Sequence, residues 1–228
     1  MKILHLYPNL MNLYGEYGNL VVLKKHLEDL GLKVEIEKKE IDESIDFSRY
    51  DMIYMGSGTE KNQLAALNDL IKYRHYLKKA IDEGKVILFT GNAMELMGES
   101  IDEHKALNFI DFSVKTEEKR YTGDVIVRNE EIGEVVGFIN KSTLIQGGEE
   151  QKLFDYVFRY TTLRDNDYEG YRLNNLFGTH IIGPVLVKNP SFMDTIVKLL
   201  ARDKYRKISY PYEEDAFETT LEQLKKRK

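Results

Sequence analysis

Residues 51–58 read DMIYMGSG and residues 85–91 read KVILFTG, and the two stretches follow the same pattern. In each, a continuous apolar run of strand length ends at a glycine, and apolar residues at helical spacing follow. A continuous apolar run is typical of a strand covered on both faces, as in a parallel sheet. The pattern predicts two buried strands, each followed by a sharp turn and a helix.

The same alternation extends toward the N-terminus. We expect strands at residues 2–7 and 33–37, and between them a helix that has Asn19 as its N-cap and ends at Gly31. A single helix is expected to carry Leu64 through Leu77 after the first turn. Strands that alternate with helices imply an α/β domain whose parallel sheet has right-handed crossovers.

Toward the C-terminus the pattern changes. Between residues 109 and 187 the segments VIVRN, EVVGFI and THIIGPVLV are β-like, and we expect them to extend the sheet. Helices are expected again at residues 193–201 and around residues 217–224, where Phe217, Leu221 and Leu224 share one face.

Composition limits the possible functions. The 228 residues are 42% hydrophobic and 31% charged, which is enough for one sizeable core. The formal charge of −5 gives no support for nucleic-acid binding. No apolar run approaches the ~18 residues that cross a bilayer, and no signal-peptide core precedes Pro8, so we expect a cytoplasmic protein without a membrane span.

The chain contains no cysteine, which excludes disulfides, thiolate metal sites and a cysteine nucleophile. His75 and His104 have no Cys, Asp or Glu partners at a recognisable metal-ligand spacing. We interpret His5 and His26 as structural or surface residues. We expect neither a metal nor a cofactor.

Five motifs then occur in one order along the chain. They are LYPNLMNLYGEYGNL (6–20), GSGTEKNQ (56–63), RYTGDVIV (120–127), VGFIN (136–140), and YEG followed by GTHIIGPVLVKNP (178–190). Together they resemble the class I glutamine amidotransferase domain of the cobyric acid synthase type. Among such domains the chain is similar to the small amidotransferase subunit of lipid II isoglutaminyl synthase, whose partner is a Mur-ligase-like subunit.

The resemblance implies a flavodoxin-like, doubly wound, largely parallel sheet with class I amidotransferase topology. We therefore expect an amidotransferase-like domain at residues 1–203 and a C-terminal helical extension at residues 204–228.

Two positions depart from the family. The turn that carries the family's nucleophilic cysteine reads GNAMELMG here, with Gly91 in the place of the cysteine. The motif that carries the family's histidine base reads GTHIIGP here, with Ile182 in the place of the histidine. Because the cysteine and the histidine act as a unit, we expect no glutaminase activity and no catalytic residue.

Replacements for the missing pair are poorly placed. His180 precedes Ile182 by two positions, about 6 to 7 Å along a strand, which is too far for a base that serves the turn. We favour a half-buried, hydrogen-bonded structural histidine. Thr90 would point to the other side of the turn, and Ser57 has no evident activating base.

Other residues remain candidates for a pocket. Gly56 and Gly58 would offer the backbone N–H groups that form part of the family's oxyanion hole. Asn92 follows Gly91 in the turn. Arg120 matches an arginine near the family's pocket, and a guanidinium suits a carboxylate from glutamine or from a partner.

Three functions stay open. The hypothesis that we favour is a noncatalytic scaffold or regulatory subunit of a Mur-ligase-like, amide-forming complex that amidates a cell-wall precursor. One alternative is an active glutamine amidotransferase or amidohydrolase with a replacement nucleophile, which would release ammonia from glutamine. The other is a sensor that binds glutamine or another small amino acid, which a glutamine-specific thermal shift would identify.

Overall fold

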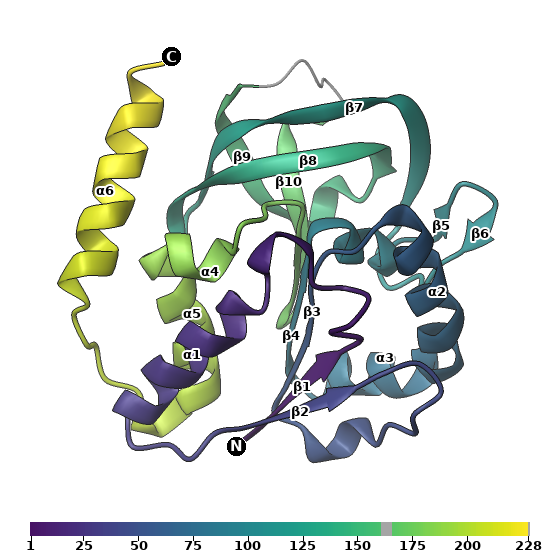
Figure 1. Cartoon of the computed structure of the whole chain (residues 1–228), viewed down its shortest axis with the longest axis horizontal. Coiled ribbons are helices and arrows are strands. Elements are labelled where there is room, and N and C mark those ends of the chain that lie inside the picture. Colours follow the sequence, from purple (N-terminus) through teal and green to yellow (C-terminus); the bar gives the residue numbers. More distant parts are fainter. Residues whose placement is uncertain (161–165, 228) are drawn as a thin grey trace.

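The computed structural model describes residues 1–160 and 166–227, and these residues form one large sheet with helices on both faces (Figure 1). The strands are β1 (Lys2–Leu6), β2 (Glu35–Lys39), β3 (Met52–Met55), β4 (Val86–Thr90), β5 (Ser100–Ile101), β6 (His104–Lys105), β7 (Phe112–Asn129), β8 (Gly133–Gly147), β9 (Lys152–Arg159), β10 (Tyr168–Leu173) and β11 (Leu176–Thr179). Their order is β2-β1-β3-β4-β11-β10-β9-β7-β5-β6, with β8 paired to β7.

The first five strands of that order pair in parallel. The order 2-1-3-4 is that of a flavodoxin-like, doubly wound sheet, which confirms the predicted fold class. Helices α1 (Gly18–Asp29), α4 (Val185–Lys188) and α5 (Pro190–Ala201) cover one face, and α2 (Glu60–Leu70) and α3 (Arg74–Asp82) cover the other (Figure 1). Along β4, Ile87 packs into the core on the α2 side and Leu88 into the core on the α1 side. Because successive strand residues face opposite sides, a strand covered by helices on both faces must be apolar throughout.

The segment after β4 is helical, as expected, but it forms a 3₁₀ helix, η4 (Gly91–Met97). Strands β7 and β8 form a long antiparallel hairpin that arches over the carboxyl ends of the parallel strands (Figure 1). The pairing of β7 with β8 shifts register between Thr116 and Tyr121, so residues 117–120 form a bulge. The hairpin contains VIVRN and EVVGFI, and both extend the sheet as predicted.

Three local predictions need correction. Only Thr179 of the predicted β-like segment THIIGPVLV lies in a strand: β11 ends there, Ile182 forms one isolated bridge to Phe138, and the residues after Pro184 form α4. Proline lacks an N–H for a sheet ladder but suits a helix start. The expected single helix over residues 64–77 is divided by the 3₁₀ turn η3 (Ile71–Tyr73) into α2 and α3.

Asn19 is not an N-cap either. It is the second residue of α1, it is fully buried, and its Nδ2 donates to the Tyr54 hydroxyl at 3.0 Å. Its Oδ1 accepts from the backbone N–H of Leu186 at 2.8 Å, at the start of α4. The Asn19 side chain was predicted to cap the helix, but it forms hydrogen bonds with residues far away in the sequence instead.

The C-terminal helix α6 (Pro211–Lys225) packs on its own chain. Leu224 is buried, and Phe217 and Leu221 pack beside it against Ile126 of β7 and Val136 of β8. Among the described residues, no helix is long and apolar enough to cross a membrane.

Candidate functional site

The turn after β4 is the tightest point of the site. Gly91 is buried and has a φ of +59°, a conformation that residues with a side chain rarely adopt. A Cβ at Gly91 would lie 2.5 Å from both Cβ and Oγ of Ser57 and 3.1 Å from Cγ2 of Ile182. The structure thus brings Gly91, Ser57 and Ile182 together, and it leaves no room for a side chain at position 91.

Two hydroxyl groups lie beside this turn, and among the described contacts only that of Thr90 reaches a carboxylate. The Ser57 hydroxyl donates to Oδ1 of Asn92 at 3.2 Å, and an amide oxygen does not remove a proton. Thr90 lies on the other side, where its hydroxyl donates to the Glu16 carboxylate and contacts the Tyr54 hydroxyl at 3.2 Å. Glu16 also accepts from the backbone N–H of Gly183 at 2.9 Å, which ties the first loop to the loop that carries Ile182.

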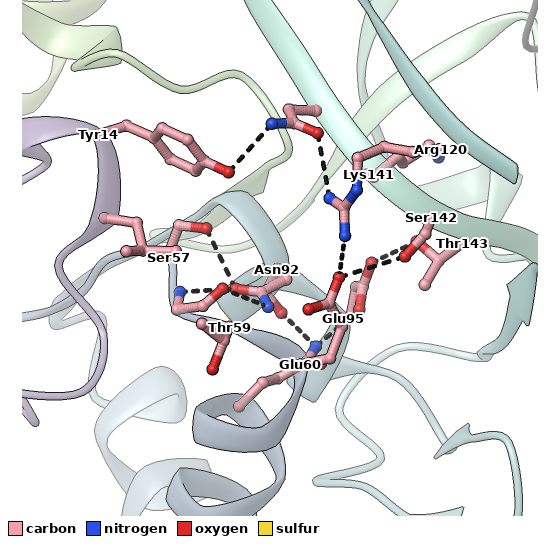
Figure 2. A pocket seen from close by; sticks show the side chains of 14 residues that line it. Tyr14, Ser57, Thr59, Glu60, Asn92, Glu95, Arg120, Lys141, Ser142 and Thr143 are labelled. Carbon is pink, nitrogen blue, oxygen red and sulfur yellow. Dashed lines mark hydrogen bonds and ion pairs between the residues drawn. The ribbon is translucent and has the colours of Figure 1, made fainter. Parts of the chain in front are cut away.

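A cavity of about 250 Å³ opens beside the turn, between α2 and the β7–β8 hairpin (Figure 2). Its wall contains both acidic and basic side chains, namely Glu60, Glu95, Arg120 and Lys141. Of the residues predicted for a pocket, Ser57, Gly58, Asn92 and Arg120 line it; Gly56 and His180 are not among its lining residues.

Asn92 and Gly58 form a paired contact at the floor of this cavity. The backbone N–H of Gly58 donates to Oδ1 of Asn92 at 2.9 Å, and Nδ2 of Asn92 donates to the Gly58 carbonyl at 3.0 Å (Figure 2). Gly58 has no room for a Cβ, which would lie 2.4 Å from the Met11 sulfur. Gln63, at the start of α2, donates to the Asn92 carbonyl at 2.7 Å and so holds the turn from the other side.

Arg120 closes the mouth of the cavity. From the β7 bulge its guanidinium forms an ion pair with Glu60 of α2 and donates to Oδ1 of Asn140 at 3.1 Å. Asn140 in turn donates to the Tyr14 hydroxyl at 3.0 Å, so four elements are joined across the opening (Figure 2). Burial raises the pKa of Glu60, but its own backbone N–H and Arg120 outweigh that effect and leave the pKa below its usual value.

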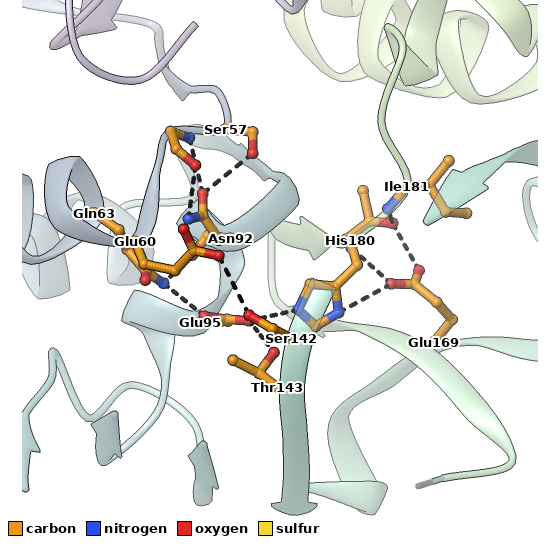
Figure 3. A network of polar contacts seen from close by, with 12 residues as sticks. Ser57, Glu60, Gln63, Asn92, Glu95, Ser142, Thr143, Glu169, His180 and Ile181 are labelled. Atoms are coloured by element: carbon orange, nitrogen blue, oxygen red, sulfur yellow. Dashed lines mark hydrogen bonds and ion pairs between the residues drawn. The ribbon is translucent and has the colours of Figure 1, made fainter. Parts of the chain in front are cut away.

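His180 lies in a buried cluster behind the cavity, and it is buried rather than half-buried as expected (Figure 3). Its Nε2 lies 3.0 Å from Oε1 of Glu95, and its Nδ1 lies 3.8 Å from Oε1 of Glu169. The backbone N–H of His180 also donates to Glu169 at 2.7 Å. Strand β11 ends just before His180, so a strand spacing does not relate it to Ile182.

The carboxyl groups of Glu95 and Glu169 in this cluster differ in the direction in which their pKa is shifted. Burial opposes ionisation of Glu95, but the bond and the charge of His180, with hydrogen bonds from Thr143 and Gln63, hold its pKa below the usual value. Burial dominates at Glu169 and raises its pKa. Glu95 thus has hydrogen-bond partners on both of its carboxylate oxygens: His180 and Thr143 on Oε1, and Gln63 on Oε2.

Sequence reasoning missed Glu95, Glu169 and Gln63. One signal was present for Glu95, which is the only charged residue in the apolar turn GNAMELMG. Glu169 lies in the YEG motif, but the motif does not indicate its partner, because that contact depends on the return of β10 beside β11. In the described part of the chain, no group of three His, Cys, Asp or Glu side chains is placed to hold a metal ion.

Solved structures with a similar fold include a glutamine amidotransferase. One crystal structure of a glutamine amidotransferase superposes with a TM-score of 0.58 at 14% identity, and it covers 87% of this chain and 98% of that chain. PurLQS from Thermotoga maritima gives a TM-score of 0.54 at 14% identity, with 78% and 85% covered. These similarities define a class I glutamine amidotransferase fold.

The family is defined by sequence. The model of the CobB/CobQ-like glutamine amidotransferase domain matches residues 2–190, and the chain belongs to this family. The GatD subunit of the glutamine-hydrolyzing lipid II isoglutaminyl synthase of Staphylococcus aureus is 28% identical, over 87% of this chain and 83% of its own. The same subunit of Streptococcus pneumoniae is 27% identical, over 94% and 86%.

Proposed function

We propose that this chain is a GatD-like subunit that does not hydrolyse glutamine. In this proposal it scaffolds or regulates a Mur-ligase-like partner that forms an amide on a cell-wall precursor in the cytoplasm, with ammonia taken from solution. The observation that carries the proposal is the turn at Gly91, in a chain that contains no cysteine. A side chain at position 91 would collide with Ser57, and the residue that faces it is Ile182, which cannot move a proton.

A replacement nucleophile at Ser57 would have no base in contact with it, and the Thr90 hydroxyl that contacts Glu16 lies on the other side of the turn. Ser57 is the hydroxyl nearest to the turn, but its hydrogen bond goes to the amide of Asn92. The only histidine of the neighbouring loop, His180, has its ring between Glu95 and Glu169. A catalytic serine needs a base within hydrogen-bond reach, and the described contacts provide none.

In contrast to the reactive positions, the similarity to the family extends over most of the chain, which supports a role as a subunit. Family similarity extends from residue 2 to residue 190, and the two curated relatives are themselves named as subunits. A chain that keeps its fold while its reactive groups are replaced supports a role in assembly.

The test measures two things on the purified chain, with and without a Mur-ligase-like partner from the same source. The first is ammonia release from glutamine, and we expect no release above the blank from the native chain or from Ser57→Ala. The second is co-elution with the partner, together with the partner's amidation rate at fixed ammonium concentration, and we expect co-elution and a changed rate. Ammonia release that Ser57→Ala or His180→Ala abolishes would overturn the proposal in favour of a working amidotransferase, and failure to co-elute would remove the scaffold role.

A further inference from the structure

The cavity beside Gly91 already contains an amide, supplied by the chain. Asn92 uses both ends of its carboxamide on one peptide unit of the facing turn: Oδ1 accepts from Gly58 N–H at 2.9 Å, and Nδ2 donates to Gly58 C=O at 3.0 Å. A third bond reaches Oδ1 from the Ser57 hydroxyl at 3.2 Å. A site with one donor and one acceptor at this spacing is complementary to a primary amide.

We propose that Asn92 is a built-in ligand, whose carboxamide fills the amide-binding part of this cavity and excludes free primary amides such as glutamine. The proposal deepens the noncatalytic function given above and rests on it, since a chain that turned glutamine over would have to admit it. The proposal also distinguishes the scaffold hypothesis from the sensor hypothesis, because a cavity whose amide site is occupied by Asn92 would not bind glutamine.

The amide is held firmly in its place. Gln63 is buried, and its Nε2 donates both to the Asn92 carbonyl at 2.7 Å and to Oε2 of Glu95 at 2.6 Å. Glu95 is itself held by His180 and Thr143 (Figure 3). The backbone of Asn92 is therefore anchored to the buried polar cluster, and the side chain is directed at Gly58.

The cationic part of the cavity is occupied in the same way. Arg120 would suit a ligand carboxylate, but its guanidinium already pairs with Glu60 and Asn140. Within one cavity the chain thus provides both an amide and a carboxylate for its own recognition groups. A ligand with both functions, such as glutamine, would have to displace Asn92 and Glu60 together.

The test is calorimetric titration of L-glutamine into the native chain, Asn92→Ala, Asn92→Asp and the control Asn62→Ala. Asn62 is a matched control because it also bonds a backbone carbonyl, that of Leu10 at 3.1 Å, yet does not line the cavity. We expect no measurable binding of glutamine to the native chain or to Asn62→Ala. Asn92→Ala should bind glutamine on the order of tenfold or more above the weakest affinity that the titration detects. Asn92→Asp should open the site only in part, because its carboxylate still accepts from Gly58 N–H and Ser57 but sets a second oxygen against the Gly58 carbonyl that Nδ2 of Asn92 had bonded.

Two outcomes would overturn the inference: no gain of glutamine binding in folded Asn92→Ala, or native binding as tight as that of the variant. Circular dichroism establishes folding, and Asn92→Ser, whose shorter side chain cannot span to Gly58, replaces Asn92→Ala if the latter does not fold. Hydrogen exchange of the Gly58 amide gives a second readout, with protection in the native chain and its loss in the variant. Glutamine binding to the variant without ammonia release supports both proposals, whereas ammonia release by the native chain overturns the proposed function whatever the variant binds.

Discussion

Gly91 and Ile182 face each other across the site: a Cβ on Gly91 would lie 3.1 Å from Cγ2 of Ile182. The turn after β4 and the loop after β11 therefore meet, and the resemblance predicts the family's cysteine and histidine at these two positions. A Cβ on Gly91 would also lie only 2.5 Å from Cβ of Ser57. Restoring a side chain at position 91 thus concerns Ser57 as much as Ile182.

Gly91→Ala should destabilise the chain through two separable effects. A left-handed backbone costs a residue with a Cβ about 1–2 kcal/mol, and overpacking against Ser57 adds about 1–3 kcal/mol. Gly31→Ala is the matched control, because Gly31 has a φ of +79° and no atom within 4 Å of an added Cβ. Urea denaturation should show a larger loss of unfolding free energy for Gly91→Ala than for Gly31→Ala. Adding Ser57→Gly to Gly91→Ala should remove this difference. Equal losses would mean that Ser57 does not crowd the turn.

His180→Ala should be strongly destabilising. The imidazole lies between the buried carboxyl groups of Glu95 and Glu169, and removing one partner of a buried pair costs about 3–5 kcal/mol. His104→Ala is the control, since that imidazole is exposed. A double-mutant cycle with Glu95→Gln should show coupling, because His180→Ala should cost less stability when residue 95 is already neutral. Additive losses in chemical denaturation would contradict the pairing.

Mild acid should destabilise the chain through His5. Burial and the nearby Lys38 charge lower the pKa of His5 from 6.5 to about 4, and its Nε2 has no hydrogen-bond partner among the described residues. The unfolded chain then binds a proton that the folded chain does not, so stability falls as pH falls from 6.5 toward 4, by about 3 kcal/mol in all.

The variant His5→Phe removes this titration and should flatten the pH dependence of unfolding between pH 6.5 and 4. At pH 8 its stability serves as the reference for the packing change alone. A profile that keeps its native slope would show that His5 is not the group responsible.

Arg120→Ala should barely affect stability. Its ion pair with Glu60 is exposed, and such pairs contribute about 0–1 kcal/mol. Lys85→Met is the contrasting variant, since the Lys85 ammonium donates to the carbonyls of Phe47, Ser48 and Tyr50 at 3.0, 2.7 and 2.8 Å. Its loss should cost about 1.5–3 kcal/mol in denaturation experiments. A large loss for Arg120→Ala would assign the arginine to the fold instead of the mouth of the cavity.

Leu224→Ala tests whether α6 is docked. Leu224 is 6% exposed against Ile126 and Val136, and its truncation should cost about 2 kcal/mol, the low end for a buried leucine, because the cluster is small. Tyr212→Ala in the same helix should stay within about 0.5 kcal/mol, because Tyr212 is 91% exposed. Equal effects in thermal unfolding would indicate that α6 is not packed on the sheet in solution.

The sequence by itself determined the sheet, the family and the missing cysteine. Continuous apolar runs such as MIYM and VILFT, each bounded by turn residues, are typical of strands covered on both faces, so the local pattern was sufficient to predict β3 and β4. It also marked Gly91 and Ile182, as the two positions where the resemblance predicts a cysteine and a histidine.

Tertiary structure alone decided what surrounds those positions. That Ser57 crowds Gly91, that Asn92 bonds Gly58, and that His180 lies between Glu95 and Glu169 all depend on loops from separate strands meeting at one edge of the sheet. Asn19 is another example: the sequence around it predicts a helix cap, but its side chain is hydrogen-bonded to Tyr54 and Leu186. Buried polar groups must find partners wherever the fold provides them, and those partners are set by packing over long sequence separations, which no local pattern records.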